Sequence, residues 1–207
     1  MNKGKLFILA VALICFPMIQ NCGGGGGGGG TSDVIVTEQL INDAWAAIDI
    51  GNYNSAQSTL QQALGQTMTD AQRIAVHNAL GWAYAKDGKV NQSIPYFEVA
   101  ATSSPADKEA KVGLAGALLW RHQTTEDYKR AAEILGNMPP EKFTSTHTGL
   151  ALSAAKVHSL AALAYALSGE MDLAQTYINK AAALDSMSVG TTVDRIDEAF
   201  QLLGWKE

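Results

Sequence analysis

Residues 77–105 read HNALGWAYAKDGKVNQSIPYFEVAATSSP and hold the clearest structural pattern of the chain. Apolar residues recur at helical spacing on both sides of Gly88, which predicts two helices joined by a tight turn. Gly81 and Ser93 are small, so we expect them where the two helices cross closely. Pro105 cannot continue a helix and is expected just after the second one. The stretch therefore predicts a helical hairpin.

The spacing of these residues resembles the tetratricopeptide repeat (TPR), whose pattern is W-x2-L-G-x2-Y, then A-x3-F, then P. In the first helix the match covers Leu80, Gly81 and Tyr84. His77 takes the place of the usual Trp, and Ser93 that of the usual Ala. The resemblance implies antiparallel helix pairs that stack into a superhelix, because one pair cannot bury its own apolar face.

Weaker copies of the same pattern precede and follow this hairpin, and together they cover about Thr37 to Asp185. Each combines small and apolar residues at matching positions. They comprise Gly51 to Ala63; Leu114, Ala115 and Leu118 with Asp127 to Leu135; and Ala161, Ala162 and Tyr165 with Gly169 to Ala181. We therefore predict an all-α fold, an α-solenoid of about four TPR hairpins plus a C-terminal capping helix.

Two segments fall outside the repeated pattern. Residues 137–150 contain Pro139 and Pro140 and are expected to form a loop with a short extra turn. Residues 192–203 place their apolar side chains on one helical face and their acids on the other. This second pattern predicts the helix that covers the last apolar face of the stack.

Residues 1–21 have the form of a secretory signal peptide. Lys3 and Lys5 precede an apolar run from Leu6 to Ile19, which is the usual order of a basic head and a hydrophobic region. The run is shorter than the roughly 20 apolar residues that a transmembrane helix needs. The segment therefore predicts export of the chain rather than a membrane span.

Cys22 directly follows this segment and directly precedes an unbroken run of glycines. The arrangement resembles that of a bacterial lipoprotein, in which the cysteine becomes the acylated first residue. The resemblance implies lipidation at Cys22, a flexible linker over residues 22–36 and a repeat domain over residues 37–207. The alternative is an ordinary signal peptide, or an uncleaved anchor, with an incidental cysteine.

Composition argues against several classes of protein. The chain has 207 residues, of which 47% are hydrophobic and 17% charged, as in ordinary globular domains. A net charge of −5 without any block of Lys or Arg argues against nucleic acid as a partner. Both cysteines precede the repeats, and the four histidines lack the spacing of metal ligands. We therefore expect no disulfide, metal or cofactor in the repeat domain.

In the TPR family the first helix of each hairpin lines a concave face that usually holds the ligand. Tryptophans on such a face are good anchors, since they bury a large area at low entropic cost. The alternative is that they pack as extra core, or that the N-terminal segment or residues 137–150 cover them. The residues that the resemblance assigns to partner binding are Trp45, Ile48, Asn78, Trp82, Lys86, Glu109, Val112, Leu119, Trp120 and Leu163, and Glu38, Ile41, Asp49, Lys156 and Ser159 share the same face.

His77 and His158 hold equivalent repeat positions and are the best candidates for a catalytic pair. We favour the interpretation that each packs where the family has Trp. No G-x-S-x-G, Walker or paired-acid motif occurs. The sequence therefore predicts a protein without catalytic activity.

These patterns predict a membrane-tethered adaptor or assembly factor of the bacterial cell envelope, of the type that serves pilus, secretion or outer-membrane assembly. Its partner is expected to be a protein or peptide, bound as an apolar extended segment or an amphipathic helix. The expected location is the outer membrane, facing the periplasm. Two alternatives stay open. One is an enzyme or non-catalytic subunit of cell-wall metabolism, and the other is a carrier of a small ligand or lipid.

Overall fold

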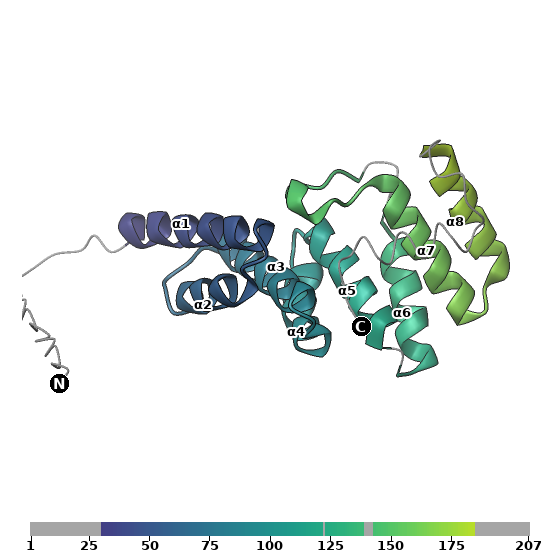
Figure 1. Cartoon of the computed structure of the whole chain (residues 1–207), viewed down its shortest axis with the longest axis horizontal. Coiled ribbons are helices and arrows are strands. Elements are labelled where there is room, and N and C mark those ends of the chain that lie inside the picture. The colour runs from purple at the N-terminus through teal and green to yellow at the C-terminus, as the bar shows by residue number, and fades with distance from the viewer. Residues whose placement is uncertain (1–29, 122, 139–142, 185–207) are drawn as a thin grey trace, which may run out of the picture.

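The computed structural model describes residues 30–121, 123–138 and 143–184, with side chains from residue 36 onward. Within these ranges the chain forms eight α-helices and one short 3-10 turn, and no strand (Figure 1). The elements are α1 (Gly30–Asp49), α2 (Tyr53–Leu64), α3 (Asp70–Lys86), α4 (Val90–Thr102), α5 (Lys108–Arg121), α6 (Thr125–Gly136), η2 (Thr148–Leu150), α7 (Ala154–Ser168) and α8 (Met171–Leu184).

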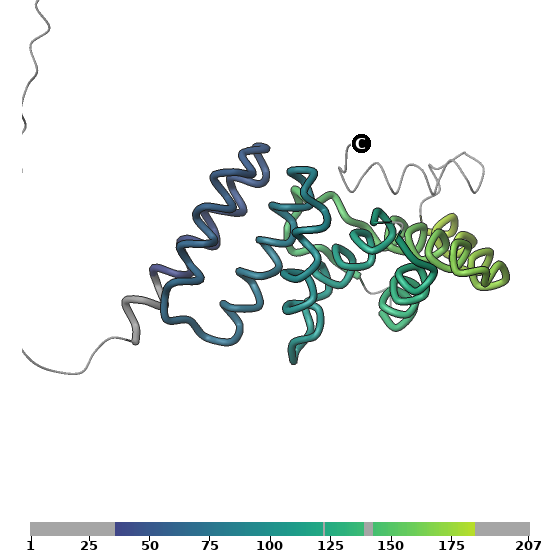
Figure 2. The backbone as a smooth tube through the Cα atoms, turned by 90° about the horizontal axis from the view of Figure 1, so that it is seen from below, coloured from purple at the N-terminus to yellow at the C-terminus, as the bar shows by residue number. Residues whose placement is uncertain are grey.

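The helices pair into four hairpins that follow one another along the long axis of the molecule (Figure 2). Each helix packs mainly on its neighbours in the chain, and α1, α3, α5 and α7 also contact one another in that order. This arrangement is an α-solenoid, so the predicted all-α fold of about four hairpins is confirmed. The predicted capping helix over residues 192–203 lies outside the described residues.

Glycines form three of the four turns within the hairpins. Gly51, Gly88 and Gly169 have φ values of 77°, 77° and 91°, a conformation that residues with a Cβ rarely adopt. In each case the residue after the glycine donates its backbone N–H to the carbonyl five positions earlier. These bonds satisfy carbonyls at the end of the first helix, which therefore stops there.

The turn of the third hairpin has no glycine and relies on an ion pair instead. The guanidinium of Arg121, at the end of α5, binds both carboxylate oxygens of Asp127, with 3.1 Å between Nε and Oδ2. Thr124 caps α6 by accepting the N–H of Asp127 through its hydroxyl, at 3.2 Å. The hydrogen bond from Arg121 lowers the pKa of the buried Asp127 carboxyl. The pair therefore links the two helices across this longer turn.

The phenyl ring of Phe97 packs where three helices meet. A Cβ added to Gly81 of α3 or to Gly113 of α5 would overlap this ring. Phe97 itself is fully buried, and the indole of Trp82 meets it edge-on with 5.3 Å between ring centroids. The predicted role of Gly81 at the helix crossing is thus confirmed. Gly113 plays the same role on the next hairpin, so one ring joins two hairpins.

The first helix starts earlier in the chain than the sequence analysis expected. The expected linker ran to residue 36, yet α1 begins at Gly30 and includes the segment before Thr37. None of the described helices combines the length and the apolar character needed to cross a membrane. The signal-peptide segment and Cys22 lie outside the described residues.

Candidate functional site

A short extended segment lies against the first helices of the hairpins. It comprises residues 143–150 (FTSTHTGL), here called the strap, and it ends in the 3-10 turn η2, which contacts α1 (Figure 1). Phe143 and Leu150 anchor its two ends and are 7% and 1% exposed, whereas Thr144, Thr146 and Thr148 between them are exposed. The expected short extra turn within residues 137–150 is therefore present.

Glu109, in the first turn of α5, holds the middle of the strap. Its Oε1 accepts the Ser145 hydroxyl at 2.6 Å and the backbone N–H groups of Thr146 and His147 at 2.6 and 2.9 Å. Its Oε2 lies 2.5 Å from Nδ1 of the His147 ring and also accepts from the Asn78 amide at 3.4 Å. Glu109 is 4% exposed. One buried carboxylate thus binds three consecutive strap residues.

The protonation state of Glu109 suits this role. Burial is the largest single influence and raises its pKa, but the hydrogen bonds from His147 and Ser145 together outweigh burial, so that the pKa falls below the ordinary value of 4.5. Glu109 is therefore a carboxylate at neutral pH. An ionised buried group needs compensation by hydrogen bonds, and the strap supplies most of it.

Trp45 of α1 forms the second contact surface for the strap. Its indole stacks on the His147 imidazole with 3.6 Å between centroids and 13° between planes. One helical turn further along, a Cβ added to Gly149 would overlap the Asp49 carboxylate, so the strap passes close to α1 there and a larger residue would displace that exposed side chain. Burial lowers the pKa of nearby Lys86, and the charge of Asp49 opposes this shift. The first hairpin therefore contacts the strap through a ring and an acid.

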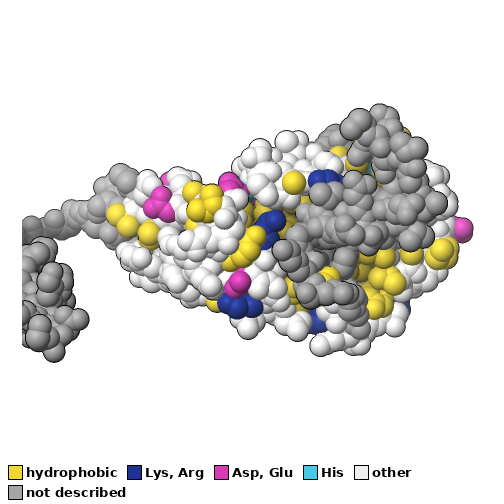
Figure 3. Space-filling view, viewed as in Figure 1, with side chains coloured by type: hydrophobic (Ala, Val, Ile, Leu, Met, Phe, Trp, Pro, Cys, Tyr) yellow, Lys and Arg dark blue, Asp and Glu magenta, His cyan; other side chains and the backbone are white. Residues whose placement is uncertain are grey.

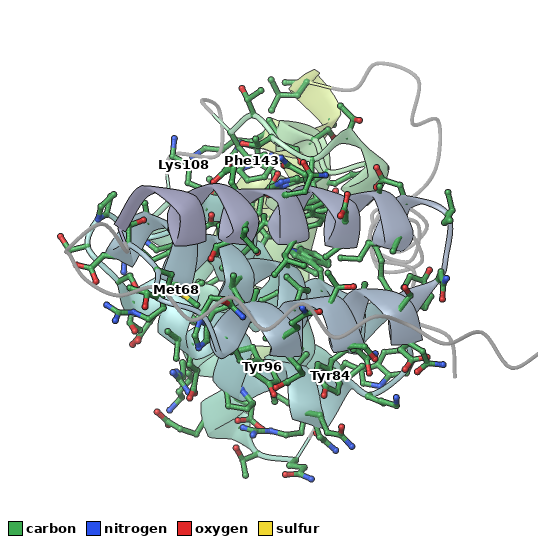
Figure 4. The ribbon with its side chains drawn as sticks, turned by 90° about the vertical axis from the view of Figure 1, so that its left-hand side faces the viewer. Met68, Tyr84, Tyr96, Lys108 and Phe143 are labelled. Carbon is green, nitrogen blue, oxygen red and sulfur yellow. The ribbon has the colours of Figure 1, made fainter. Side chains whose placement is uncertain are left out.

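A cleft of about 480 Å³ with both polar and apolar lining residues lies beside the strap. It is lined by strap residues on one side and by the start of α3 and the loop before α5 on the other. In Figure 4, Phe143 and Lys108 lie beyond one edge of α1, whereas Tyr84 and Tyr96 lie on the opposite side, beyond α2. The cleft residues are Asp70, Ala71, Ile74, Ser104, Pro105, Ala106, Asp107, Lys108, Glu109, Thr144, Thr146 and His147.

Most of the residues predicted to line a partner groove are buried. Contacts between neighbouring hairpins and the strap itself cover them. This agrees with the alternative in which the tryptophans pack as core or lie under residues 137–150, since Trp82 is fully buried and Trp45 is 6% exposed. Partner binding at this face stays a prediction. Buried are Trp45, Ile48, Asn78, Trp82, Glu109, Val112 and Leu119, with Ile41 and Ser159; half-buried are Lys86, Trp120, Leu163 and Lys156; exposed are Glu38 and Asp49.

The strap residues of this site were missed by sequence reasoning. Ser145, His147 and Gly149 lie outside the repeats, and the pattern of the repeats says nothing about them. Two of the bonds to Glu109 come from backbone N–H groups, which have no side-chain signature. The one available signal was position, because residues 137–150 were expected to lie where they could cover the face.

The two histidines at equivalent repeat positions pack as core-flanking rings. His77 contacts Tyr96 across its hairpin, with 6.2 Å between centroids, and His158 contacts Tyr177 across its own, with 5.7 Å. Each ring thus packs on a tyrosine of the second helix of its hairpin, as the packing interpretation expects. Among the described residues, no group of three or more His, Cys, Asp or Glu side chains is placed to hold a metal ion.

On the face shown in Figure 3, the exposed apolar side chains do not form one continuous surface. Figure 3 shows the apolar groups of one face in small separate patches, some beside Lys or Arg side chains. Scattered exposure of this kind is normal for a folded chain. The strongest structural feature on the first-helix face is therefore the strap and its two holders, Glu109 and Trp45.

The repeated hairpins and their stacking define a TPR-like α-solenoid. Among solved structures, the protein titled "MamA MSR-1 C2" superposes on the chain with a TM-score of 0.51 and 23% sequence identity, over 74% of this chain and 79% of that one. No protein-family model and no curated protein matches the chain. The structural likeness shows the fold.

Proposed function

We propose that the protein is a membrane-tethered adaptor of the bacterial cell envelope that holds a segment of a client protein against its first-helix face. One observation carries this proposal: that face already holds an extended segment, the strap, through a buried carboxylate and a stacked indole. Solenoids of stacked helix pairs offer extended concave surfaces suited to such ligands. The TPR-like fold agrees with a protein or peptide as partner.

Attachment to the membrane would come from Cys22. Acylation there would anchor the chain, and the following glycines would act as a flexible tether. A mature chain cut before Cys22 would lose Lys3 and Lys5 and become more acidic, so attraction to anionic lipid would not hold it. We place the protein at the outer membrane facing the periplasm.

The adaptor would act by recruitment rather than catalysis. A tether raises the local concentration of the binding face near the membrane, which strengthens weak contacts with clients that assemble there. The lowered pKa values of the Glu109 and Asp127 carboxyls are each accounted for by structural partners, His147 with Ser145 for Glu109 and Arg121 for Asp127. Charged groups with structural roles of this kind favour a binding protein over an enzyme. We propose that its clients belong to pilus, secretion or outer-membrane assembly.

Site-specific photo-crosslinking in intact cells tests the adaptor role. A photoreactive residue at Lys86 or Leu163 samples the first-helix face, and one at Val99, which is 39% exposed on α4, serves as the matched control. We expect a discrete protein adduct from the first two positions and not from the third. Adducts that are absent, or the same at all three positions, would contradict the proposal.

A second experiment tests the tether. Cys22→Ser removes the only acylation site that we propose. We expect the wild-type chain in the membrane fraction, carrying acyl groups detectable by mass spectrometry of its N-terminal peptide, and the variant in the soluble fraction. A variant that stays with the membrane to the same extent would argue against lipid attachment at this residue.

A further inference from the structure

The contacts of the strap define what the first-helix face can recognise. They consist of one hydroxyl group, two consecutive backbone N–H groups and one planar ring, all from Ser145 to His147. Apolar side chains at both ends, Phe143 and Leu150, are buried. Any extended peptide supplies the backbone donors, so the selective features are the hydroxyl, the ring two residues later and the apolar ends.

We propose that Glu109 and Trp45 form the site that binds a client segment of this same chemistry, and that the strap occupies the site until such a segment displaces it. The inference rests on the proposed adaptor function and specifies its partner. The client segment is extended, with Ser or Thr two residues before His or an aromatic residue, and with an apolar residue on either side.

The burial of Glu109 is the first reason why a client segment would replace the strap rather than bind to an empty site. The carboxylate is 4% exposed and accepts four bonds from the strap. Leaving a buried charge without partners is costly, whereas swapping one set of equivalent donors for another is not. The site is therefore always filled, by the strap or by a segment that offers the same donors.

The exposure of the strap is the second reason. Thr144, Thr146 and Thr148 are exposed, and the cleft beside the strap runs along Thr144, Thr146 and His147. An incoming segment can therefore bind in this cleft, beside the strap, before the strap leaves Glu109. Because the strap is part of the same chain, it competes for the site at an effective concentration on the order of millimolar. Weak ligands therefore cannot displace the strap, whereas ligands that bind more tightly can.

Binding of the strap peptide in trans tests the proposal. The probe is a labelled, end-blocked octapeptide with the sequence FTSTHTGL, added to the full chain and followed by fluorescence anisotropy. The strap is released in cis by the double substitution Ser145→Ala and His147→Ala, with folding checked by circular dichroism. We expect the double variant to bind the peptide at least tenfold more tightly than the wild-type chain.

Two controls make the test specific to the Glu109 site. A peptide with Ala at the Ser and His positions should not bind the double variant. Adding Glu109→Gln to the double variant should weaken binding of the natural peptide at least tenfold. If the folded double variant does not bind the peptide, or binds it equally with Glu109→Gln, the proposal is overturned.

A milder variant covers the case in which the double substitution prevents folding. Thr146→Pro removes one backbone donor to Glu109 at an exposed position and leaves the side chains of Ser145 and His147 in place. This variant should also bind the peptide more tightly than the wild-type chain, and unchanged binding would count against the proposal.

The outcome also separates this inference from the adaptor function. A discrete cellular adduct at Lys86 together with no peptide binding would overturn the proposal that Glu109 binds the client segment and would leave the adaptor role intact. If the purified chain binds the peptide in a way that depends on Glu109, but cells give no adduct, the result would support peptide recognition by Glu109 and count against the adaptor role.

Discussion

The imidazole of His147 lies flat on the indole of Trp45, 3.6 Å away between ring centroids. The same imidazole contacts the carboxylate of Glu109 through Nδ1, at 2.5 Å. Trp45 belongs to the first hairpin and Glu109 to the third. One strap residue therefore connects two hairpins that are not neighbours in the stack, and the second hairpin lies between them.

His147→Ala should detach the middle of the strap without unfolding the repeats. The variant loses the ring stack and a charge-assisted hydrogen bond, so we expect the free energy of unfolding to fall by about 1–2 kcal/mol. Urea denaturation measures this change, and hydrogen exchange at the Thr146 amide should accelerate. Thr148→Ala, at an exposed position on the same strap, should change stability by less than about 0.5 kcal/mol. Equal losses in the two variants would contradict the role given to His147.

The bond from Glu109 to the strap should weaken at acidic pH. The folded pKa of Glu109 is below its ordinary value of 4.5, so its contribution to stability is complete above that pH and is lost as the pH falls through the lowered pKa. The amide protons of Thr146 and His147 donate to this carboxylate and should report its titration by NMR, with a midpoint below 4.5.

The neighbouring acid provides the control for this titration. Asp107 faces the same cluster, and burial raises its pKa above the ordinary value of 3.8. Its carboxylate accepts the Ala110 amide at 2.8 Å, so that amide reports Asp107 separately. Glu109→Gln should abolish the titration of the two strap amides and keep that of Ala110, with a lower midpoint because the charge of Glu109 also raises the pKa of Asp107. Strap amides with a midpoint at or above 4.5 would show that the strap does not lower the pKa of Glu109.

Gly81→Ala should destabilise the fold because its Cβ would overlap the buried ring of Phe97. We expect a loss of about 1–3 kcal/mol, as for other overpacked cores. Adding Phe97→Leu to Gly81→Ala should cost less than Phe97→Leu costs alone in the wild-type background, since the smaller side chain makes room. Gly65→Ala is the control, because its Cβ would meet only the Gln62 carbonyl at an ordinary 3.4 Å. Similar losses at the two glycines would refute the steric argument.

Asp127→Asn should destabilise the third hairpin more than an equivalent change on the surface. Asp127 is buried, and Arg121 lowers its pKa, so the ion pair contributes stability above the ordinary pKa of 3.8 and loses it below. We expect a loss of about 1–3 kcal/mol at neutral pH. Glu98→Gln breaks the more exposed pair with Arg130 and should cost no more than about 1 kcal/mol. Thermal unfolding at pH 7 and pH 3 compares them, and the difference between Asp127→Asn and wild type should shrink at the lower pH.

The repeats could be predicted from the sequence because their determinants are local. The φ values at Gly51, Gly88 and Gly169 and the small residue at position 81 depend on one hairpin each, so a pattern repeated along the chain indicates them directly. The start of α1 was placed too late, since a run of glycines argues for a linker and says nothing about where a helix resumes.

The exposure of the first-helix face could not be predicted in the same way. Family resemblance assigns Trp45 and Trp82 to this face, but burial there depends on neighbouring hairpins and on the strap, which has no repeat pattern. The bonds from Thr146 and His147 to Glu109 are made by backbone atoms. Contacts of this kind depend on the path of the chain and become visible only in three dimensions.

The position of Phe97 has a consequence for how the molecule comes apart. Its ring fills space left open by Gly81 in the second hairpin and by Gly113 in the third. If either hairpin opens, the ring therefore loses one of the two helices that enclose it. In a linear array each module would otherwise melt according to its own stability and that of its interfaces. The second and third hairpins therefore behave as one cooperative folding unit, and fraying from either terminus should stop at this ring.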